Sequence, residues 1–172
     1  MPYGHGHDGA EQAYWFDGLD VPLTRLLEPM FFEEHPAGFA PVERVTEQSP
    51  MRFTFADTLA RLASAQDDPY FGVTVEIAAP TMPTITLRVH AWEAGWENAA
   101  YRRSAHTIYV VMAGSGRSTI GEQTFDWQFG DTIAAPAWSR IAHHAHEDTV
   151  MFSMSDEQLM RWARYYRLED LA

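Results

Sequence analysis

From Tyr70 onward, apolar and polar side chains alternate with a period of two residues. The apolar members of the first two runs are Phe71, Val73, Val75 and Ile77, and then Ile85, Leu87, Val89 and Ala91. Alternation of this length is typical of half-buried strands, and the segment 79–83, which contains two prolines, separates the runs. The pattern therefore predicts two antiparallel strands with their apolar side chains inward. His90 falls on the polar side and is expected at the surface or at an interface.

Short segments with strand character follow at close spacing. They are residues 107–113, 116–120, 123–127, 131–135, 140–145 and 149–154. The turns between them carry glycine, at Gly114-Ser115-Gly116, Gly121-Glu122 and Gly130-Asp131. Many short strands joined by regular glycine turns indicate a β-sandwich or a β-barrel. We therefore expect the stretch from Tyr101 to Met154 to form a compact barrel.

The patterns on the N-terminal side of the barrel are weaker. Tyr14-Trp15-Phe16 is aromatic and suits a strand. Residues 21–34 predict short helical pieces, with Pro22 at the start, and residues 53–66 predict a helix.

A second helix is expected after the barrel. Ser155 and Gln158 have the spacing of a capping box, which opens a helix. Its inward face is expected to consist of Leu159, Trp162, Ala163 and Tyr166. The chain is thus divided into an arm with short helices, residues 1–69, and a barrel with a terminal helix, residues 70–172.

Composition narrows the possible functions. The 172 residues include 12 Lys+Arg and 24 Asp+Glu, so the net charge is −12, which argues against binding to nucleic acid or to an anionic membrane. No apolar run approaches the roughly 18 residues of a membrane span, and a cytoplasmic location is the expectation. There is no cysteine, so a metal would need His and carboxylate ligands. His5 and His7 lie in a glycine-rich end, where ordering a metal site is entropically costly.

The densest group of histidines is His143, His144 and His146. Strand alternation points His143 toward the lumen and the other two outward, so the three cannot converge on one ion. We therefore interpret His143 as a lumenal residue that is hydrogen-bonded to a neighbour such as Tyr109. His106 is expected to face away from the lumen.

Several motifs resemble one known family. In the barrel they are Gly114-Ser115-Gly116-Arg117-Ser118-Thr119-Ile120-Gly121, Phe125-Asp126-Trp127, Gly130-Asp131, Pro136-Ala137-Trp138 and Phe152-Ser153-Met154-Ser155-Asp156. Outside it they are Trp15-Phe16-Asp17-Gly18-Leu19-Asp20-Val21-Pro22-Leu23, Phe31-Phe32-Glu33 and Met82-Pro83-Thr84-Ile85. They resemble the C-terminal cupin and the interdomain arm of the gentisate 1,2-dioxygenase family, which includes salicylate and 1-hydroxy-2-naphthoate dioxygenases. The resemblance implies an all-β fold, the cupin double-stranded β-helix or jelly-roll barrel. An N-terminal arm, one short helix before the barrel and a C-terminal helix complete it.

The resemblance also implies a chemistry. Family members have two cupins, and three histidines of the N-terminal cupin hold Fe(II), which opens the ring of an aromatic acid with O2. His5 and His7 resemble the tail of that cupin, but its His-x-His strand has no counterpart in this chain. Asp17 matches an acid that is proposed to assist proton transfer. An aspartate that stabilises the turn at Gly18 is an equally good interpretation.

In the barrel itself, the resemblance places residues that are not metal ligands at the ligand positions of cupins. Tyr101 and Arg103 occupy the His-x-His positions, Thr107 the glutamate position and Ile141 the position of the last histidine. A fixed cation such as Arg103 repels a metal ion. We therefore expect no cofactor in this chain, and Fe(II) only in the full-length family.

Three hypotheses for the function remain open. In the first, the chain is the metal-free C-terminal cupin half of a gentisate 1,2-dioxygenase-like protein, inactive alone. It would form a homo-oligomer, a dimer or a tetramer, through the arm and the sheet faces. In the second, the barrel binds an aromatic carboxylate with Arg103 in a pocket lined by Tyr101, Arg103, Thr107, Tyr109, Ile141 and His143. In the third, His90, His106 or His143 hold Fe(II) in an unusual geometry and the chain is an active dioxygenase.

Overall fold

The computed structural model describes residues 6–7, 9–28, 33–38, 44–46, 49, 52–77 and 82–171. Contacts divide the chain into two compact units, residues 1–49 and residues 50–172, and each is described by itself below. The predictions for His5, for Phe31-Phe32 and for most of the break at 79–83 lie outside the described residues. The division at residue 69, which separates arm from barrel by role, stays a prediction.

In the first unit, the described residues contain one helix, α1 (Val21–Leu26). Pro22 lies in its first turn, where a missing N–H costs nothing, so the predicted short helix after this proline is confirmed. The helix has ended by Glu28, which has a φ of 57° and precedes a proline in the sequence. The predicted strand at Tyr14-Trp15-Phe16 is wrong, because these residues do not pair with another strand.

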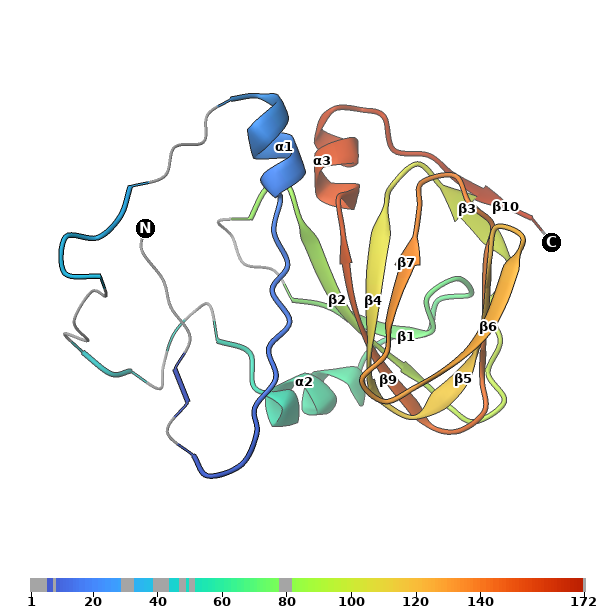
Figure 1. Cartoon of the computed structure of the whole chain (residues 1–172). Helices are drawn as coiled ribbons and strands as arrows, with labels where there is room; N and C mark the ends of the chain where they lie inside the picture. The colour runs from blue at the N-terminus through green and yellow to red at the C-terminus, as the bar shows by residue number, and fades with distance from the viewer. Residues whose placement is uncertain are drawn as a thin grey trace. The chain divides into compact units, whose positions relative to one another are not determined.

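Two antiparallel five-stranded sheets form the barrel of the second unit (Figure 1). The first sheet has the order β1 (Val73–Glu76), β2 (Thr86–Trp92), β9 (Thr149–Ser155), β4 (Thr107–Ala113) and β7 (Thr132–Ala135). The second has the order β10 (Leu168–Asp170), β3 (Tyr101–Arg103), β8 (Ile141–Ala145), β5 (Ser115–Ile120) and β6 (Gln123–Gln128). The predicted all-β fold with few short helices is confirmed, and the predicted strands of the barrel correspond to β4 through β9. Gly121 and Gly130 take positive φ values of 62° and 89° at the predicted turns.

The main core fills the space between the two sheets. Its buried members are Trp92, Tyr101, Tyr109, Val111, Ile120, Trp127, Ile133, Ala135, Ile141, Ala145 and Met151. They come mostly from alternate positions of strands that face one another, as the period of two requires. These apolar side chains therefore line much of the interior of the barrel.

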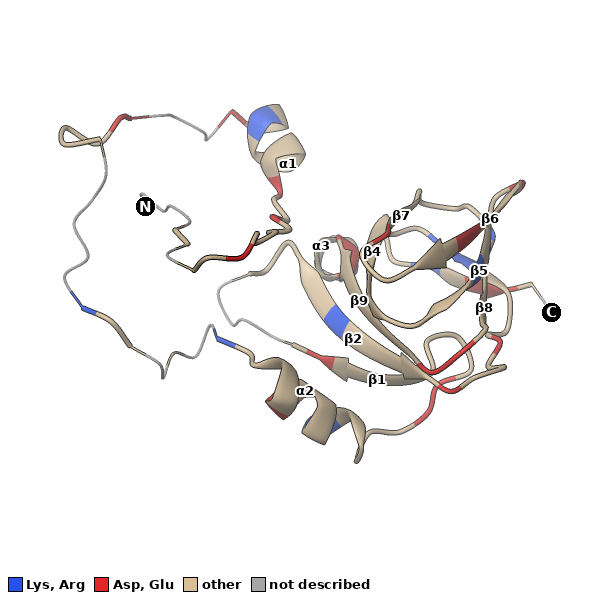
Figure 2. Ribbon diagram, turned by 60° about the horizontal axis from the view of Figure 1, so that its bottom comes forward, with Lys and Arg blue, Asp and Glu red and all other residues tan. Residues whose placement is uncertain are grey.

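A second, smaller cluster lies on the outside of the first sheet, under α2 (Phe55–Leu62). Thr54 caps this helix by accepting a hydrogen bond from the backbone N–H of Asp57, at 3.1 Å. Leu62 packs with Val75, Ile77 and Val89, and Figure 2 shows α2 running along β1. The predicted helix at 53–66 is thus confirmed with shorter ends.

The cluster under α2 explains why one sequence expectation is wrong. His90 was expected outside, but only 2% of it is exposed. On β2 the apolar positions such as Val89 face α2, and the alternate positions, His90 and Trp92, face the interior of the barrel. Both faces of β2 are therefore covered, and the polar face is the lumenal one.

The C-terminal helix is shorter than predicted. α3 (Glu157–Trp162) begins after Asp156, whose side chain makes no capping hydrogen bond, so the predicted capping box does not form. Ser155 instead accepts a hydrogen bond from the N–H of Glu157. Trp162 was expected inward and is 82% exposed. The chain then turns into β10, a short edge strand that has no clear alternation in the sequence.

Within the part of the chain that the structure describes, no helix is long and apolar enough to cross a membrane.

Candidate functional site

The predicted pocket residues lie on three strands that surround the interior of the barrel. Tyr101 and Arg103 are on β3, Thr107 and Tyr109 on β4, and Ile141 and His143 on β8. All six are buried, because each occupies an inward position of its strand. The structure thus brings them to one interior, while their role in binding a ligand stays a prediction.

Glu157, at the start of α3, is the charged centre of this interior. Its carboxylate is 1% exposed and accepts hydrogen bonds from Arg88 at 2.6 and 3.0 Å, from Arg103 at 2.7 Å and from Arg161 at 2.7 Å. Burial alone would raise the pKa of Glu157, but the bonds and charges of Arg88, Arg161 and Arg103 lower it to about 2. Glu157 is therefore ionised and ties α3 to β2 and β3.

Sequence reasoning missed Glu157. An acid in the first turn of a helix is ordinary, since it complements the helix dipole. Its partner Arg88 lies 69 residues earlier in the chain, so no local spacing connects the two. The one signal in the sequence was the predicted position of Arg103 inside the barrel. A buried cation needs a carboxylate nearby, because an unpaired buried charge is costly.

His90 is fully committed to hydrogen bonds within the barrel wall. Its Nδ1 lies 2.8 Å from Thr74 Oγ1 and 3.2 Å from the carbonyl oxygen of Phe71, and its Nε2 lies 2.8 Å from Ser153 Oγ. Burial, with the charges of Arg88 and Arg103 second, lowers the pKa of His90 to about 3. Neither ring nitrogen is therefore available to a metal without breaking these bonds.

His143 is lumenal, as predicted, but its partner is different. Ser118 pairs with His143 across the β5–β8 ladder, and Ser118 Oγ lies 2.6 Å from His143 Nδ1. Trp127 Nε1 donates to the same hydroxyl at 2.8 Å. Tyr109 contacts the imidazole only through its ring, with centroids 5.0 Å apart. Burial, and then the charge of Arg103, lowers the pKa of His143 to about 3, so the ring is neutral.

The other barrel histidines face outward, as predicted. His106 is exposed, and its Nδ1 accepts a hydrogen bond from the N–H of Ala137 at 3.2 Å. His144 and His146 contact each other on the outer side of the barrel, and His144 Nδ1 lies 2.7 Å from Glu97 Oε1. These side chains cannot join His143 around one ion.

The residues of the barrel do not fit an iron centre. Across the described part of the chain, no group of three or more His, Cys, Asp or Glu side chains could hold a metal ion. At the positions that resemble metal ligands, Tyr101 and Ile141 are buried in the core, and Arg103 Nη2 donates to Thr107 Oγ1 at 2.5 Å. A guanidinium and a hydroxyl thus interact where ligands would be needed.

Asp17 belongs to the first unit and is exposed. Its proposed role in proton transfer needs a substrate near it, and that role stays a prediction.

Two antiparallel five-stranded sheets around one interior give this protein a cupin-like fold. The salicylate 1,2-dioxygenase of Pseudaminobacter salicylatoxidans has the same fold over 88% of this chain and 53% of its own, with a TM-score of 0.71 at 22% identity. No family model matches the chain.

The curated relatives of the chain are 1,2-dioxygenases. The 5-aminosalicylate 1,2-dioxygenase of Comamonas sp is 26% identical over 95% of this chain and 52% of its own length. The 1-hydroxy-2-naphthoate 1,2-dioxygenase of Nocardioides sp. strain KP7 is 27% identical over 90% of this chain and 48% of its own. The chain is a homologue of the gentisate, salicylate and 1-hydroxy-2-naphthoate 1,2-dioxygenase family, and it spans about half the length of these relatives.

Proposed function

We propose that this gentisate 1,2-dioxygenase-like cupin is the metal-free C-terminal half of the family's two-cupin architecture. Its role is structural, it forms a homo-oligomer, and it does not open aromatic rings by itself. The observation that carries the proposal is the state of Arg103. This residue, at a position that resembles a metal ligand, is 2% exposed and bonded to Glu157 and Thr107. A buried, ion-paired cation excludes a second cation from the same space.

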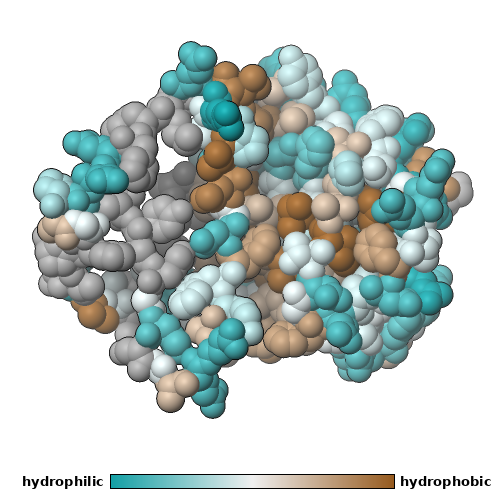
Figure 3. Space-filling view, viewed as in Figure 1, coloured by the Kyte–Doolittle hydropathy of each residue, from teal (hydrophilic) through white to brown (hydrophobic). Residues whose placement is uncertain are grey.

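The outer face of the first sheet supports the oligomeric part of the proposal. Inward positions of β4 and β9, such as Tyr109 and Met151, are buried, and the alternate positions point outward. Those outward side chains are half-buried and apolar: Ile108, Val110, Met112, Val150, Phe152 and Met154. Val150 and Phe152 pack against the cluster under α2, so the face beyond that cluster is the part left for a subunit. In Figure 3 apolar side chains gather over these strands. A contiguous apolar sheet face is the kind of surface that a second subunit covers.

Oxygen uptake tests the absence of ring-cleaving activity. The purified chain is mixed with Fe(II) and with gentisate, salicylate or 5-aminosalicylate, and the O2 electrode trace is compared with a protein-free control. We expect no difference from that control. The 5-aminosalicylate 1,2-dioxygenase of Comamonas sp serves as the positive control. Fe-dependent uptake that scales with the concentration of this chain would refute the proposal and revive the hypothesis of an active dioxygenase.

Light scattering tests the oligomer. We expect the mass of the purified chain to be a dimer or a tetramer, and Val110→Lys to lower it, because a buried ammonium is costly at an apolar interface. Thr119→Lys, on the exposed side of β5, is the matched control and should leave the mass unchanged. A monomeric wild-type chain, or equal masses for all three proteins, would contradict an interface on this face.

A further inference from the structure

The barrel interior contains hydrogen-bond donors for which the described residues supply no acceptor. Arg103 Nε and His143 Nε2 are both shielded from solvent and have no partner. The hydroxyls of Tyr101 and Tyr109 lie 3.2 Å apart, and one of them donates to the other. The hydroxyl that accepts still carries a hydrogen of its own. Buried donors without acceptors are rare in proteins, because each costs roughly 1–3 kcal/mol.

The hydrogen bonds of Ser118 decide which kind of group His143 presents. Trp127 Nε1 can only donate, so Ser118 Oγ accepts from it. Among the hydrogen bonds of the described residues, His143 Nδ1 is the one acceptor for the hydrogen of the serine hydroxyl, so we assign that hydrogen to this bond. A neutral imidazole with an accepting Nδ1 carries its proton on Nε2. His143 therefore offers an N–H to the interior, as Arg103 does.

The charges around Glu157 point in the same direction. Three guanidinium groups, those of Arg88, Arg103 and Arg161, donate to this one buried carboxylate. A second carboxylate, Glu76, reaches Arg88 at 3.3 Å but is 47% exposed and screened by water. Among the groups bonded to Glu157, positive charge therefore exceeds negative charge, although the whole chain is acidic.

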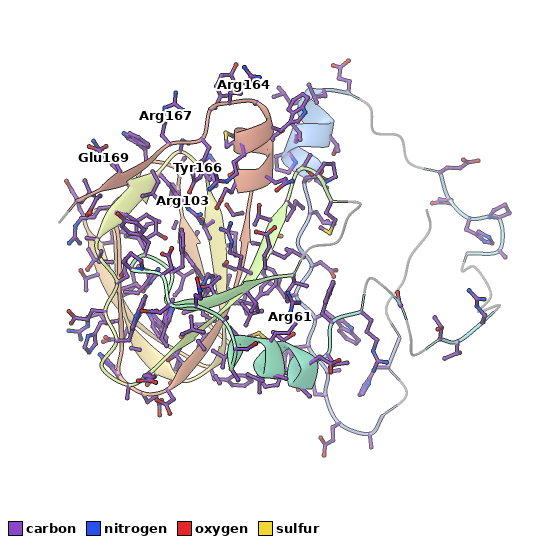
Figure 4. The ribbon with its side chains drawn as sticks, turned by 180° about the vertical axis from the view of Figure 1, so that it is seen from behind. Arg61, Arg103, Arg164, Tyr166, Arg167 and Glu169 are labelled. Atoms are coloured by element: carbon purple, nitrogen blue, oxygen red, sulfur yellow. The ribbon has the colours of Figure 1, made fainter. Side chains whose placement is uncertain are left out.

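The rim above Arg103 is basic as well. Arg164 and Arg167 are exposed, and neither forms an ion pair with any residue that the structure describes. In Figure 4 they lie with Tyr166 at the end of the barrel where α3 leads toward β10, and Arg103 lies further inside. Arg161 stacks on the ring of Tyr166, with its Cζ 4.0 Å from the centroid. Two unpaired cations at the rim would attract an anion toward this end.

We propose that the interior of this barrel binds a small monocarboxylate. The carboxylate accepts hydrogen bonds from Arg103 Nε–H and from a hydroxyl of the Tyr101–Tyr109 pair. The bound ligand also changes the surroundings of the N–H of His143. Phe71, with its centroid 5.3 Å from Arg103 Cζ and 5.5 Å from the ring of Tyr101, supplies an apolar wall for the rest of the ligand. Because the donors are shielded from solvent, the ligand reaches them only when part of the barrel opens.

This site differs from the pocket predicted from the sequence in how Arg103 acts. Nη1 donates to Glu157 and Nη2 to Thr107, so Nε is the guanidinium nitrogen that has no partner among the described residues. Glu157 fixes the orientation of the guanidinium. The inference is independent of the proposed function, because a barrel without activity or without a partner subunit keeps these donors.

Titration calorimetry on the full chain tests the site with benzoate and acetate, and with benzamide and acetamide as neutral isosteres. We expect heat from at least one carboxylate and none from the amides. Arg103→Lys keeps the charge that faces Glu157 but removes the Nε donor, and it should weaken carboxylate binding at least tenfold. Arg102→Lys is the matched control on the same strand, since Arg102 points outward to Glu169, and it should bind as the wild type does. Equal affinities of the two variants, or heat from no carboxylate at millimolar concentration, would overturn the proposal.

A measurement on the wild-type chain covers the case in which Arg103→Lys does not fold. The side-chain N–H of His143 is buried and should give a protected signal in ¹⁵N-resolved NMR spectra. We expect benzoate, and not benzamide, to shift this signal in a saturable manner. A signal that is unmoved by saturating benzoate would count against the site. The oxygen-uptake assay measures neither carboxylate binding nor the His143 signal. Failure of the binding site can therefore be told apart from failure of the proposed function.

Discussion

Replacing Glu157 by glutamine removes one charge from the interior and nearly preserves the shape of the side chain. The amide oxygen of the variant can still accept hydrogen bonds, but its NH2 group would face arginine donors. Arg103, which is 2% exposed, would lose the only carboxylate that the structure places against it. Breaking a buried ion pair by removing one partner typically costs about 3–5 kcal/mol.

The lowered pKa of Glu157 gives a second measure of how much its charge contributes to the free energy of unfolding. It falls from an ordinary value of 4.5 to about 2, which at about 1.4 kcal/mol per pH unit is worth roughly 3 kcal/mol. We therefore expect Glu157→Gln to lower the free energy of unfolding at pH 7 by about 3 kcal/mol. Urea denaturation followed by tryptophan fluorescence measures it, with Glu169→Gln as control. Glu169 pairs with Arg102 at the surface, so its loss should matter far less.

The sign of the pH dependence distinguishes this charge effect from a packing defect. A carboxylate with a lowered pKa contributes its full stability above the unfolded pKa, near 4.5, and loses it as the pH falls toward 2. The gap between wild type and Glu157→Gln should therefore close between pH 4.5 and pH 2. A gap that stays constant over this interval would refute the electrostatic reasoning, as would equal losses for Glu157→Gln and Glu169→Gln at pH 7.

Three further expectations concern the barrel. His143 has a pKa lowered to about 3, so the folded state loses stability as the pH falls from 6.5 toward 3. His143→Gln should reduce the slope of unfolding free energy in that interval by about 1.4 kcal/mol per pH unit, and an unchanged slope in urea titrations would contradict this. Gly116→Ala should lower the free energy of unfolding by about 1–3 kcal/mol in the same assay, because a β-carbon would overlap the Trp127 ring and the carbonyl of the neighbouring strand. An unchanged urea midpoint would show that the neighbouring strands move apart to accommodate the methyl group. Asp126→Asn breaks only the exposed pair with Arg117 and should leave the melting temperature unaltered in calorimetry; a clear drop would mean that the pair is coupled to the core.

The strands of the barrel were predictable because their signal is local. Alternation over four to seven residues and glycine at the turns define β4 through β9 without reference to anything distant. β10 was not predictable, since three residues are too few to show a period, and its pairing with β3 joins distant parts of the chain. The aromatic stretch at Tyr14–Phe16 was misread for the opposite reason, because strand propensity without a partner strand forms no ladder.

The interior was harder to predict than the strands. An alternating pattern tells the two faces of a strand apart, but it does not say which face lies toward the lumen. On β2 the apolar face meets α2 and the polar face, with His90, meets the barrel interior, so the usual rule gave the wrong side. The hydrogen bond from Ser118 to His143 and the ion pairs of Glu157 depend on cross-strand register and on long-range contacts. Those come only from the assembled fold.

Arg103 gives the barrel a positive centre that belongs to the polypeptide. An ion held by side chains exchanges with the medium, and the stability it lends depends on its free concentration. The guanidinium of Arg103 is covalently part of β3 and cannot dissociate. The attraction between Arg103 and Glu157 therefore does not depend on the concentration of a free metal ion. A chelating agent should therefore leave the thermal unfolding of this barrel unchanged. α3, which Glu157 ties to β2 and β3, is therefore held by charges that the polypeptide itself carries.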